Sequence, residues 1–459
     1  MNTTSVAGSW SGTCTSAEDA HERYTEFEIT EQDGSWYGKR KNRKDSNAQP
    51  FKLEWTGANE FKGDMNHWII TTKIGVIGTF DTDFSRLKLD IFGEGMSGLD
   101  DYTVHLKKSK DDMAVYTTPF DASTYKYRAP RPGSLASCDA QDVGILPEAL
   151  ESLVQDLASL KGSIDEVKTP RVEAVNVLKN GKLILEEYFW GMDRNSRHII
   201  SSCTKSITAI LLCIAVDQKQ ADLEANLADV LESTSSWGDS PPIKVKHLLS
   251  MTTGTSTGFE DALELLLSED IVKTSLNKRR IKEPGSTYQY DNNLPAVIGC
   301  YLEMVTGMSV EDFAEKYLFG PLGISNYRWT YMRPLAPTGK RSVLTAGGLY
   351  ISMNELTKIG LMMIQNGKFD GTAILSPNMV NICTSQHTAK GDYPYGFYWH
   401  LHQNSAHYPG MGGFSALGQG EQIVSVFPDK DLVVVVFSAS WHSASTSITE
   451  TLSPHLRSL

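Results

Sequence analysis

The chain has 459 residues, 40% hydrophobic and 21% charged, as expected for a globular protein of two or three domains. Its net charge of -12 argues against nucleic acid or an anionic membrane as a partner, because both are bound through basic patches. The chain begins without a signal-peptide pattern, and no apolar run approaches the roughly 20 residues that span a bilayer. Six scattered cysteines lack metal-site spacing, so we expect reduced thiols in a cytoplasmic protein.

Residues 1–118 are predicted to form an all-β domain. Short runs of alternating polar and apolar residues follow one another here, and Gly, Asp and Asn separate them. Regular short strands are typical of a barrel or a sandwich. The segment Gly8-Ser9-Trp10-Ser11-Gly12 and the succession of hairpins resemble a lipocalin-like barrel. Whether the barrel binds a ligand stays open, since Trp10 would serve equally well to close one of its ends.

Residues 119–146 are predicted to be a linker, because they lack periodicity and are interrupted by Pro, Ser and Gly. Residues 147–459 mix helices and strands. The spacing of leucines predicts an amphipathic helix at 147–162. Two hairpins are expected, with turns at Asn180-Gly181 and at Pro428-Asp429-Lys430. Strands at both ends, with helices between them, predict an α+β or α/β domain in which helices flank an antiparallel sheet.

The segment HIISSCTKSITAILLC (198–213) carries the first candidate for chemistry. Ser202 and Lys205 would lie one turn apart on the same face of an apolar helix. In its first turn, unpaired N–H groups and the helix dipole favour developing negative charge. A buried lysine can lose its proton and then accept the proton of a serine nucleophile. Alone the pattern is weak, since Ser202 could simply be a helix cap.

The segment EPGSTYQYDNN (283–293) supplies possible partners ahead of a second apolar helix. A tyrosine beside a lysine can relay a proton, and an asparagine offers both a donor and an acceptor. We assign these roles to Tyr290 and Asn292. Tyr288 competes for the first role, but only Tyr290 has an asparagine two positions later.

Ser202-Cys203-Thr204-Lys205 followed by Tyr290-Asp291-Asn292 resembles the serine β-lactamase and penicillin-binding-protein superfamily. The closest branch contains 6-aminohexanoate-dimer hydrolase and related carboxylesterases. The resemblance covers about residues 147–440 and implies a β-lactamase-like sheet domain with an all-helical subdomain. Further matching phrases follow in the order of the family: HLLSMTTG (247–254), FGPLGI (319–324), TAGGLYISMNELTKIGLMMIQNGKFDG (345–371) and YPYGFYWH (393–400).

The third motif of the superfamily, Lys-Thr-Gly or His-x-Gly, is absent. By the resemblance, Ala416-Leu417-Gly418 takes its position, although a plain turn is the alternative. Gly418 would permit a close backbone approach, and the N–H groups of Gln419 and Ser202 would form an oxyanion hole. An apolar Ala-Leu-Gly cannot bind a substrate carboxylate with a charged side chain. This departure argues against efficient penicillin hydrolysis or D-Ala-D-Ala peptidase action.

The sequence therefore predicts a serine hydrolase that cleaves a small-molecule ester or amide through an acyl-enzyme on Ser202. Lys205 and Tyr290 would exchange the proton, and no cofactor or metal is expected. One alternative is an acyltransferase or peptide cyclase that uses the same acyl-enzyme. Another is a non-catalytic protein that binds a small ligand. A homodimer is possible.

Overall fold

The computed structural model describes most of the chain in two units. By their contacts within the chain, Met1–Phe120 and Lys161–Thr169 form the first unit, and Asp121–Leu160 and Pro170–Leu459 form the second. The boundaries expected from the sequence, at 118 and 146, stay a prediction. The described residues are 8–16, 23–32, 34–41, 51–66, 73–80, 86–92, 102–108, 124–160, 172–189, 192, 194–231, 242–257, 274–275, 277–292, 294–331, 342–403, 405, 408–438 and 447–459.

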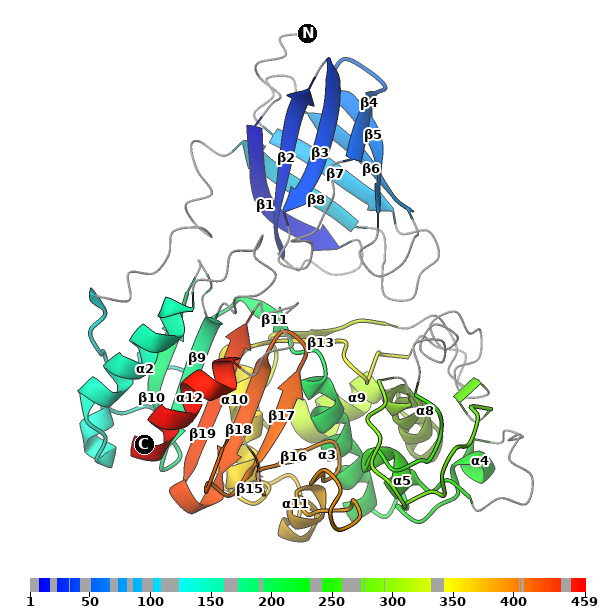
Figure 1. The fold of residues 1–459 in the computed structure, drawn as a ribbon, viewed down its shortest axis with the longest axis vertical. Helices are drawn as coiled ribbons and strands as arrows, with labels where there is room; N and C mark the ends of the chain where they lie inside the picture. The colour runs from blue at the N-terminus through cyan, green and yellow to red at the C-terminus, as the bar shows by residue number, and fades with distance from the viewer. Residues whose placement is uncertain are drawn as a thin grey trace. The chain divides into compact units, whose positions relative to one another are not determined.

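The first unit contains a closed antiparallel barrel, so the all-β prediction is confirmed (Figure 1). Each strand pairs with the next, and the last strand pairs with the first. The lipocalin-like character stays a prediction, and the side chain of Trp10 lies outside the described part. The strands are β1 (Gly8–Ser16), β2 (Arg23–Gln32), β3 (Ser35–Lys41), β4 (Phe51–Trp55), β5 (Glu60–Asn66), β6 (Lys73–Phe80), β7 (Arg86–Phe92) and β8 (Tyr102–Lys108).

Aromatic rings occupy part of the barrel interior. The rings of Trp55 and Phe80 stack with their centroids 6.0 Å apart, and Phe61 packs beside both. A Cβ atom on Gly78 would lie 2.1 Å from the ring of Phe61, so only glycine fits against that ring. This part of the barrel is therefore packed like an ordinary core.

The described part of the segment that we expected to be a linker, residues 124–146, is attached to the second unit. Leu183 donates its N–H to the carbonyl of Ala136 at 2.8 Å and accepts the N–H of Cys138 at 3.1 Å. The hydroxyl of Tyr125 donates to Glu187 at 2.9 Å. These bonds attach the segment to strand β10 (Lys182–Tyr188), which satisfies polar groups of its backbone and side chains. The linker assignment stays a prediction.

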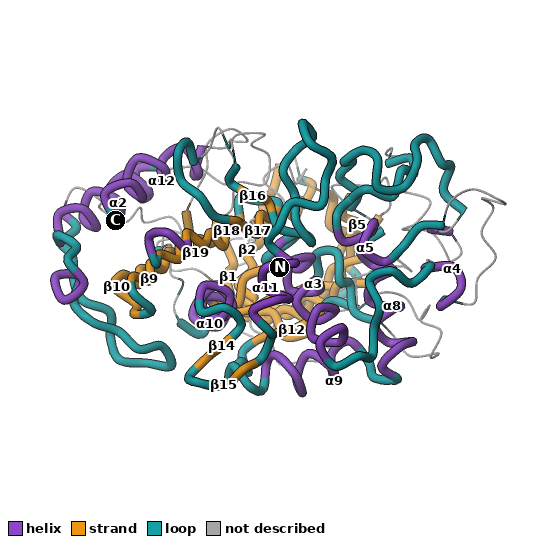
Figure 2. Tube along the Cα trace, turned by 90° about the horizontal axis from the view of Figure 1, so that it is seen from below, coloured by secondary structure: helices purple, strands orange, loops and turns teal. Residues whose placement is uncertain are grey.

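A six-stranded antiparallel sheet forms the centre of the second unit, in the order β10-β9-β19-β18-β17-β16. Helices α2 and α12 lie on one face and α10 on the other (Figure 2). Both expected hairpins are confirmed, as is the helix predicted at 147–162. The elements are α2 (Pro147–Ser159), β9 (Val172–Lys179), α10 (Met353–Ile364), β16 (His400–Leu401), β17 (Phe414–Gly418), β18 (Gln422–Phe427), η5 (Pro428–Lys430), β19 (Leu432–Ser438) and α12 (Ser447–Ser458).

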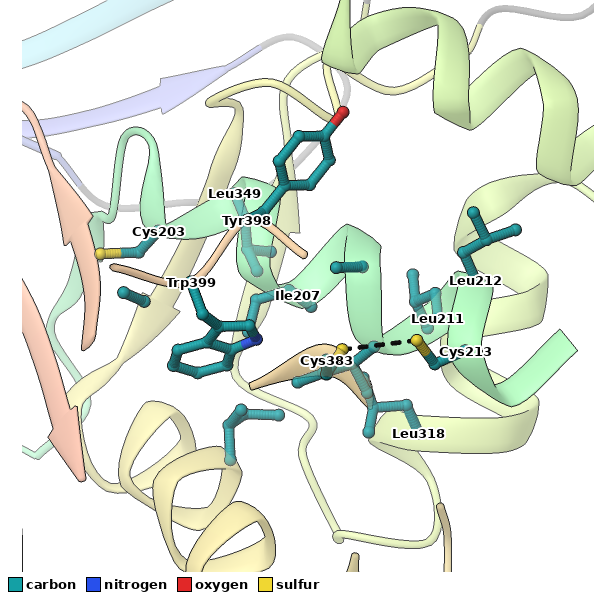
Figure 3. Packing of buried hydrophobic residues seen from close by; sticks show 14 of the residues in the cluster. Cys203, Ile207, Leu211, Leu212, Cys213, Leu318, Leu349, Cys383, Tyr398 and Trp399 are labelled. Atoms are coloured by element: carbon teal, nitrogen blue, oxygen red, sulfur yellow. Dashed lines mark hydrogen bonds between the residues drawn. The ribbon is translucent and has the colours of Figure 1, made fainter. Parts of the chain in front are cut away.

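Helix α3 (Cys203–Asp217) runs through the interior, and its residues 203–215 are all buried. Ile207 and Leu211 of α3 belong to the same apolar cluster as Trp399 (Figure 3). The Sγ atoms of Cys213 and Cys383 point toward each other and lie 3.4 Å apart. Buried contacts around α3 therefore hold its first residues in a defined place.

Smaller elements complete the second unit, and a helical region beside α3 agrees with the expected helical subdomain. None of the helices in the described part is long and apolar enough to cross a membrane. These elements are η3 (Ala140–Val143), β11 (Arg197–Ile199), α4 (Leu227–Val230), α5 (Val245–Leu249), α8 (Pro295–Thr306), α9 (Val310–Ala314), η4 (Glu315–Phe319), β12 (Tyr327–Trp329), β13 (Leu349–Ser352), β14 (Lys368–Phe369), β15 (Thr372–Ala373) and α11 (Pro377–Cys383).

Candidate active site

Ser202 stands at a sharp turn between β11 and α3. The preceding residue, Ser201, has a φ of 47°, which is unusual for a residue other than glycine. The N–H groups of the next three residues are bound inside the turn: Cys203 to the carbonyl of Ile200, Thr204 to that of Ser201, and Lys205 to that of Ser202. The turn thus brings the Ser202 side chain to the very start of a buried helix.

Lys205 is bound directly to Ser202. Its Nζ donates to Ser202 Oγ at 2.8 Å, to the carbonyl of Ala346 at 2.8 Å, and at 3.4 Å to Oδ1 of Asn292. Only 2% of Lys205 is exposed. Burial lowers the pKa of Lys205 from 10.5 to about 7, although the nearby carboxylate of Asp291 opposes this shift. Near neutral pH, a large fraction of this amine is therefore neutral and can accept a proton.

The structure places Tyr290, and not Tyr288, against this pair. Ser202 lies near enough to the Tyr290 hydroxyl to lower its pKa, and Lys205 Nζ lies 5.3 Å from the centroid of the Tyr290 ring. Burial raises the pKa of Tyr290 to about 12, so the phenol keeps its proton at neutral pH. The ring of Tyr288 packs instead against Tyr393 and Tyr395, with centroids 5.3 and 5.1 Å away.

Asn292 is exposed, and its one contact with the pair is the long hydrogen bond that Lys205 donates. The four residues predicted from the first two motifs, Ser202, Lys205, Tyr290 and Asn292, are thus brought together, although their segments lie far apart in the chain. They present a hydroxyl, a partly neutral amine, a protonated phenol and an amide.

Gly418 ends strand β17 beside the start of α3. A Cβ atom at this position would lie 2.3 Å from the carbonyl oxygen of Ile200 and 3.3 Å from the nitrogen of Cys203. Only glycine permits this approach of strand and turn. Gln419 follows in the turn between β17 and β18, with its side chain exposed. The strand expected to line the site therefore reaches the residues that flank Ser202.

Two features of the site were missed in the sequence. The carbonyl of Ala346 binds Lys205, but a backbone acceptor leaves no mark in a sequence. The carboxylate of Asp291, inside the Tyr-x-Asn motif, forms a buried ion pair with Lys278, 2.6 Å from Nζ to Oδ2. The sequence showed that Asp291 lies between two motif residues, but it did not show that Lys278 is its partner.

Tyr398 is bound to the residue that follows Lys205. Its φ is 58°, it is 1% exposed, and its hydroxyl has no hydrogen-bond partner among the described residues. Its carbonyl accepts the hydroxyl of Ser206, next to Lys205, at 2.6 Å. Its ring points away from that of Trp399 (Figure 3). A bulky residue in this backbone conformation is strained, which is common beside functional sites.

No group of three His, Cys, Asp or Glu side chains that could hold a metal ion occurs in the described part of the chain.

Comparison with known proteins agrees with this geometry. The Beta-lactamase family model matches residues 166–452. The 6-aminohexanoate-dimer hydrolase of Paenarthrobacter ureafaciens is 22% identical over 326 residues, which is 65% of this chain and 79% of that protein. The ML-236A carboxylate methylbutanoyltransferase of Penicillium citrinum is 28% identical over 151 residues, so the match spans 28% of this chain and only 36% of that relative.

Among solved structures, EstCE1, a hydrolase with promiscuous acyltransferase activity, superposes with a TM-score of 0.54 at 18% identity. The match covers 67% of this chain and 99% of EstCE1, and it shows the fold alone. The family match spans more than half of the 459 residues. The chain therefore belongs to the beta-lactamase family of serine hydrolases and their relatives, with an additional β-barrel in its first unit.

Proposed function

We propose that the protein is a serine hydrolase that cleaves an ester or amide bond of a small molecule through an acyl-enzyme on Ser202. The observation that carries this proposal is the 2.8 Å hydrogen bond from Lys205 to Ser202. It joins a nucleophile to a buried amine whose pKa is lowered to about 7. That combination activates a hydroxyl that would otherwise be a weak nucleophile.

In this scheme Ser202 Oγ attacks the substrate carbonyl while Lys205 Nζ accepts the serine proton. The C–O or C–N bond to the leaving group then breaks, and Tyr290 donates a proton to the departing atom. A phenol with a pKa near 12 is protonated before the reaction, so Tyr290 can act as this proton donor. Lys205 returns a proton to Tyr290, and water then releases the acyl group by the reverse route. Asn292 orients Lys205 through its side-chain oxygen.

The negative charge on the substrate oxygen would be held by the N–H groups of Ser202 and Gln419. The close approach of Gly418 to Ile200 and Cys203 supports this assignment, since it brings the two backbone segments together. The residues before Gln419 on β17, Ala416 to Gly418, offer no cation. We therefore propose substrates without an obligatory carboxylate, such as simple esters or linear amides.

Intact-protein mass spectrometry tests the proposal. The full chain and Ser202→Ala are exposed briefly to a p-nitrophenyl ester, a simple amide and a penicillin. We expect the wild type to gain the mass of the acyl group with the ester, and Ser202→Ala to gain none. The scheme would be rejected if Ser202→Ala turned over the ester at the wild-type rate, or if Ser202→Ala still gained the mass of the acyl group.

An acyltransferase is the second candidate, because the relative from Penicillium citrinum is named a methylbutanoyltransferase and EstCE1 is described as promiscuous in acyl transfer. An amine or alcohol would replace water at the same acyl-enzyme. Decay of the acyl-enzyme with added amines separates the two. Faster decay with a new amide product supports transfer or cyclisation, whereas hydrolysed product alone rejects it. A non-catalytic ligand-binding protein is left if no donor acylates Ser202.

We also propose that the protein is cytoplasmic and that it forms a homodimer. The thiols support the first, since Cys138, Cys203, Cys213 and Cys383 form no disulfide. Size-exclusion chromatography with light scattering tests the second, and a mass of one chain at all concentrations would reject it.

A further inference from the structure

We propose that Lys278 and Asp291 form a buried positioning pair that holds Tyr290 and Asn292 at Lys205 and sets the electrostatic field in which Lys205 exchanges its proton. This inference rests on the proposed role of Lys205 as the base. It adds a pair of residues that touch neither Ser202 nor the reacting atoms, but act on those that do.

The geometry fixes Asp291 on three sides. Its Oδ2 accepts from Lys278 Nζ at 2.6 Å, and its Oδ1 accepts the N–H of Leu294 at 3.0 Å, at the start of α8. Its own N–H donates to Sδ of Met251 at 3.4 Å. Asp291 lies between Tyr290 and Asn292 in the chain, so anchoring it also fixes the backbone that carries both neighbours.

Burial makes this pair costly. The side chains of Lys278 and Asp291 are only 2% and 3% exposed. Removing two charges from water costs free energy, and only close geometry and further hydrogen bonds offset this cost. A protein with an apolar pair of similar volume in their place is often as stable. A purely structural role would therefore not require charges here. Their placement behind Tyr290 and Asn292 points to a role in the site.

Asp291 is the charged group whose field reaches Lys205. The titratable side chains that act on Lys205 are Asp291 and Cys203, and the ring of Tyr290 lies beside it. Burial raises the pKa of the Cys203 thiol far above neutrality, so it carries no charge. Asp291 favours the charged form of Lys205. A positive charge on Lys278, whose Nζ lies 2.6 Å from Oδ2 of Asp291, would offset part of that effect. The pair thus sets how far burial lowers the pKa of Lys205: Asp291 limits the shift, and Lys278 limits the effect of Asp291.

The test uses a fluorophosphonate probe, which needs no knowledge of the substrate. Ser202 Oγ would displace fluoride from phosphorus: an O–P bond forms, a P–F bond breaks, and the serine proton passes to Lys205. The labelling rate of the full chain is followed by intact mass from about pH 5 to about pH 9. The variants are Lys278→Met, Asp291→Asn and the double variant.

We expect the wild-type rate to rise with pH through the pKa of Lys205, at about 7. In Lys278→Met the rise should move to higher pH by about one unit, because the positive charge closest to Asp291 Oδ2 is removed. In Asp291→Asn and in the double variant it should move to lower pH. Lys244→Met is the matched control, because Lys244 pairs with Glu224 at the surface. Its profile should equal that of the wild type.

The outcomes separate this inference from the proposed function. If the wild type is not labelled at Ser202, the proposed function fails. If it is labelled, but the profiles of Lys278→Met and Asp291→Asn coincide with the wild type, the positioning pair is overturned. Should Lys278→Met not fold, Asp291→Asn decides alone, since its amide oxygen can still accept the N–H of Leu294.

Discussion

At the scale of single residues, the burial of Lys205 costs stability but also produces the state that the proposed chemistry needs. Its Nζ lies in an apolar interior and finds three oxygen acceptors, on Ser202, Asn292 and Ala346. Lowering the pKa of a lysine from 10.5 to about 7 by burial costs on the order of a few kcal/mol of stability while the amine is protonated. The same burial produces the neutral amine that the proposed chemistry needs.

Lys205→Met should abolish most of the acylation of Ser202, with a rate about 10²–10⁴ lower, because the general base is lost. It should also raise stability at pH 6. The cost of the buried ammonium is fully present below about pH 7 and disappears as the pH rises toward 10.5, where the unfolded chain also loses the proton. Urea unfolding at several pH values checks this. A stability difference that does not shrink with rising pH would contradict it.

Tyr290→Phe should slow acylation and leaving-group departure by about 10² or more, with little loss of stability, since only a hydroxyl is removed. Tyr288→Phe is the matched control, because its ring packs against Tyr393 and Tyr395 and not against Lys205. Turnover of a p-nitrophenyl ester and of a poorer leaving group measures both variants. If Tyr290→Phe and Tyr288→Phe lost the same fraction of the turnover rate, the assignment of Tyr290 as the proton donor would be wrong.

At the scale of elements, the site depends on how closely β17 approaches the start of α3. Gly418 has no side chain to separate the strand from the turn, and the thiol of Cys203 donates to the carbonyl of Gln422, the first residue of β18, at 3.4 Å. The start of α3 therefore contacts both strands of this hairpin near Ser202. Neither element alone could bring Gly418 against the residues that flank Ser202.

Gly418→Ala should push β17 away from α3, because its Cβ would lie 2.3 Å from the carbonyl oxygen of Ile200. We expect roughly 1–3 kcal/mol of destabilisation and a clear fall in the acylation rate. Gly57→Ala is the comparison, since a Cβ there would meet only the side chain of Glu60 at an ordinary 3.8 Å. Unchanged acylation in a normally folded Gly418→Ala protein would mean that this approach does not matter for catalysis.

At the scale of the whole molecule, the described site residues all belong to the second unit, whereas the barrel closes on its own ring of hydrogen bonds. The aromatic packing of Trp55, Phe61 and Phe80 gives the barrel a core of its own. We therefore expect the two units to be separable, as domains with independent cores usually are.

A shortened chain that begins at Asp121 should fold and label Ser202 with the fluorophosphonate at the rate of the full chain. The hydrogen bonds of Tyr125, Ala136 and Cys138 to the second unit are the reason to cut before this segment and not at residue 147. Thermal unfolding by circular dichroism is the folding control. Loss of labelling in a folded fragment would show that the barrel takes part in the site.

Local patterns determined much of the fold before any tertiary contact was known. The leucine spacing of α2 and the turns at Asn180-Gly181 and Pro428–Lys430 depend on periodicity and on the backbone preferences of a few neighbouring residues. The Ser202–Lys205 spacing likewise predicted a contact within one helical turn, and the hydrogen bond between them has that geometry. Interactions over so few residues can be read from a sequence alone.

Only the tertiary structure decided the rest. The contact of Tyr290 with Lys205, the hydrogen bond from Lys205 to the carbonyl of Ala346 and the partnership of Lys278 with Asp291 each join segments that meet only after folding. The pKa of Lys205 depends on burial, which is a property of everything packed around it. The sequence by itself determined which groups could react, and the fold determined which of them meet, how dry their surroundings are, and therefore in which protonation state they stand.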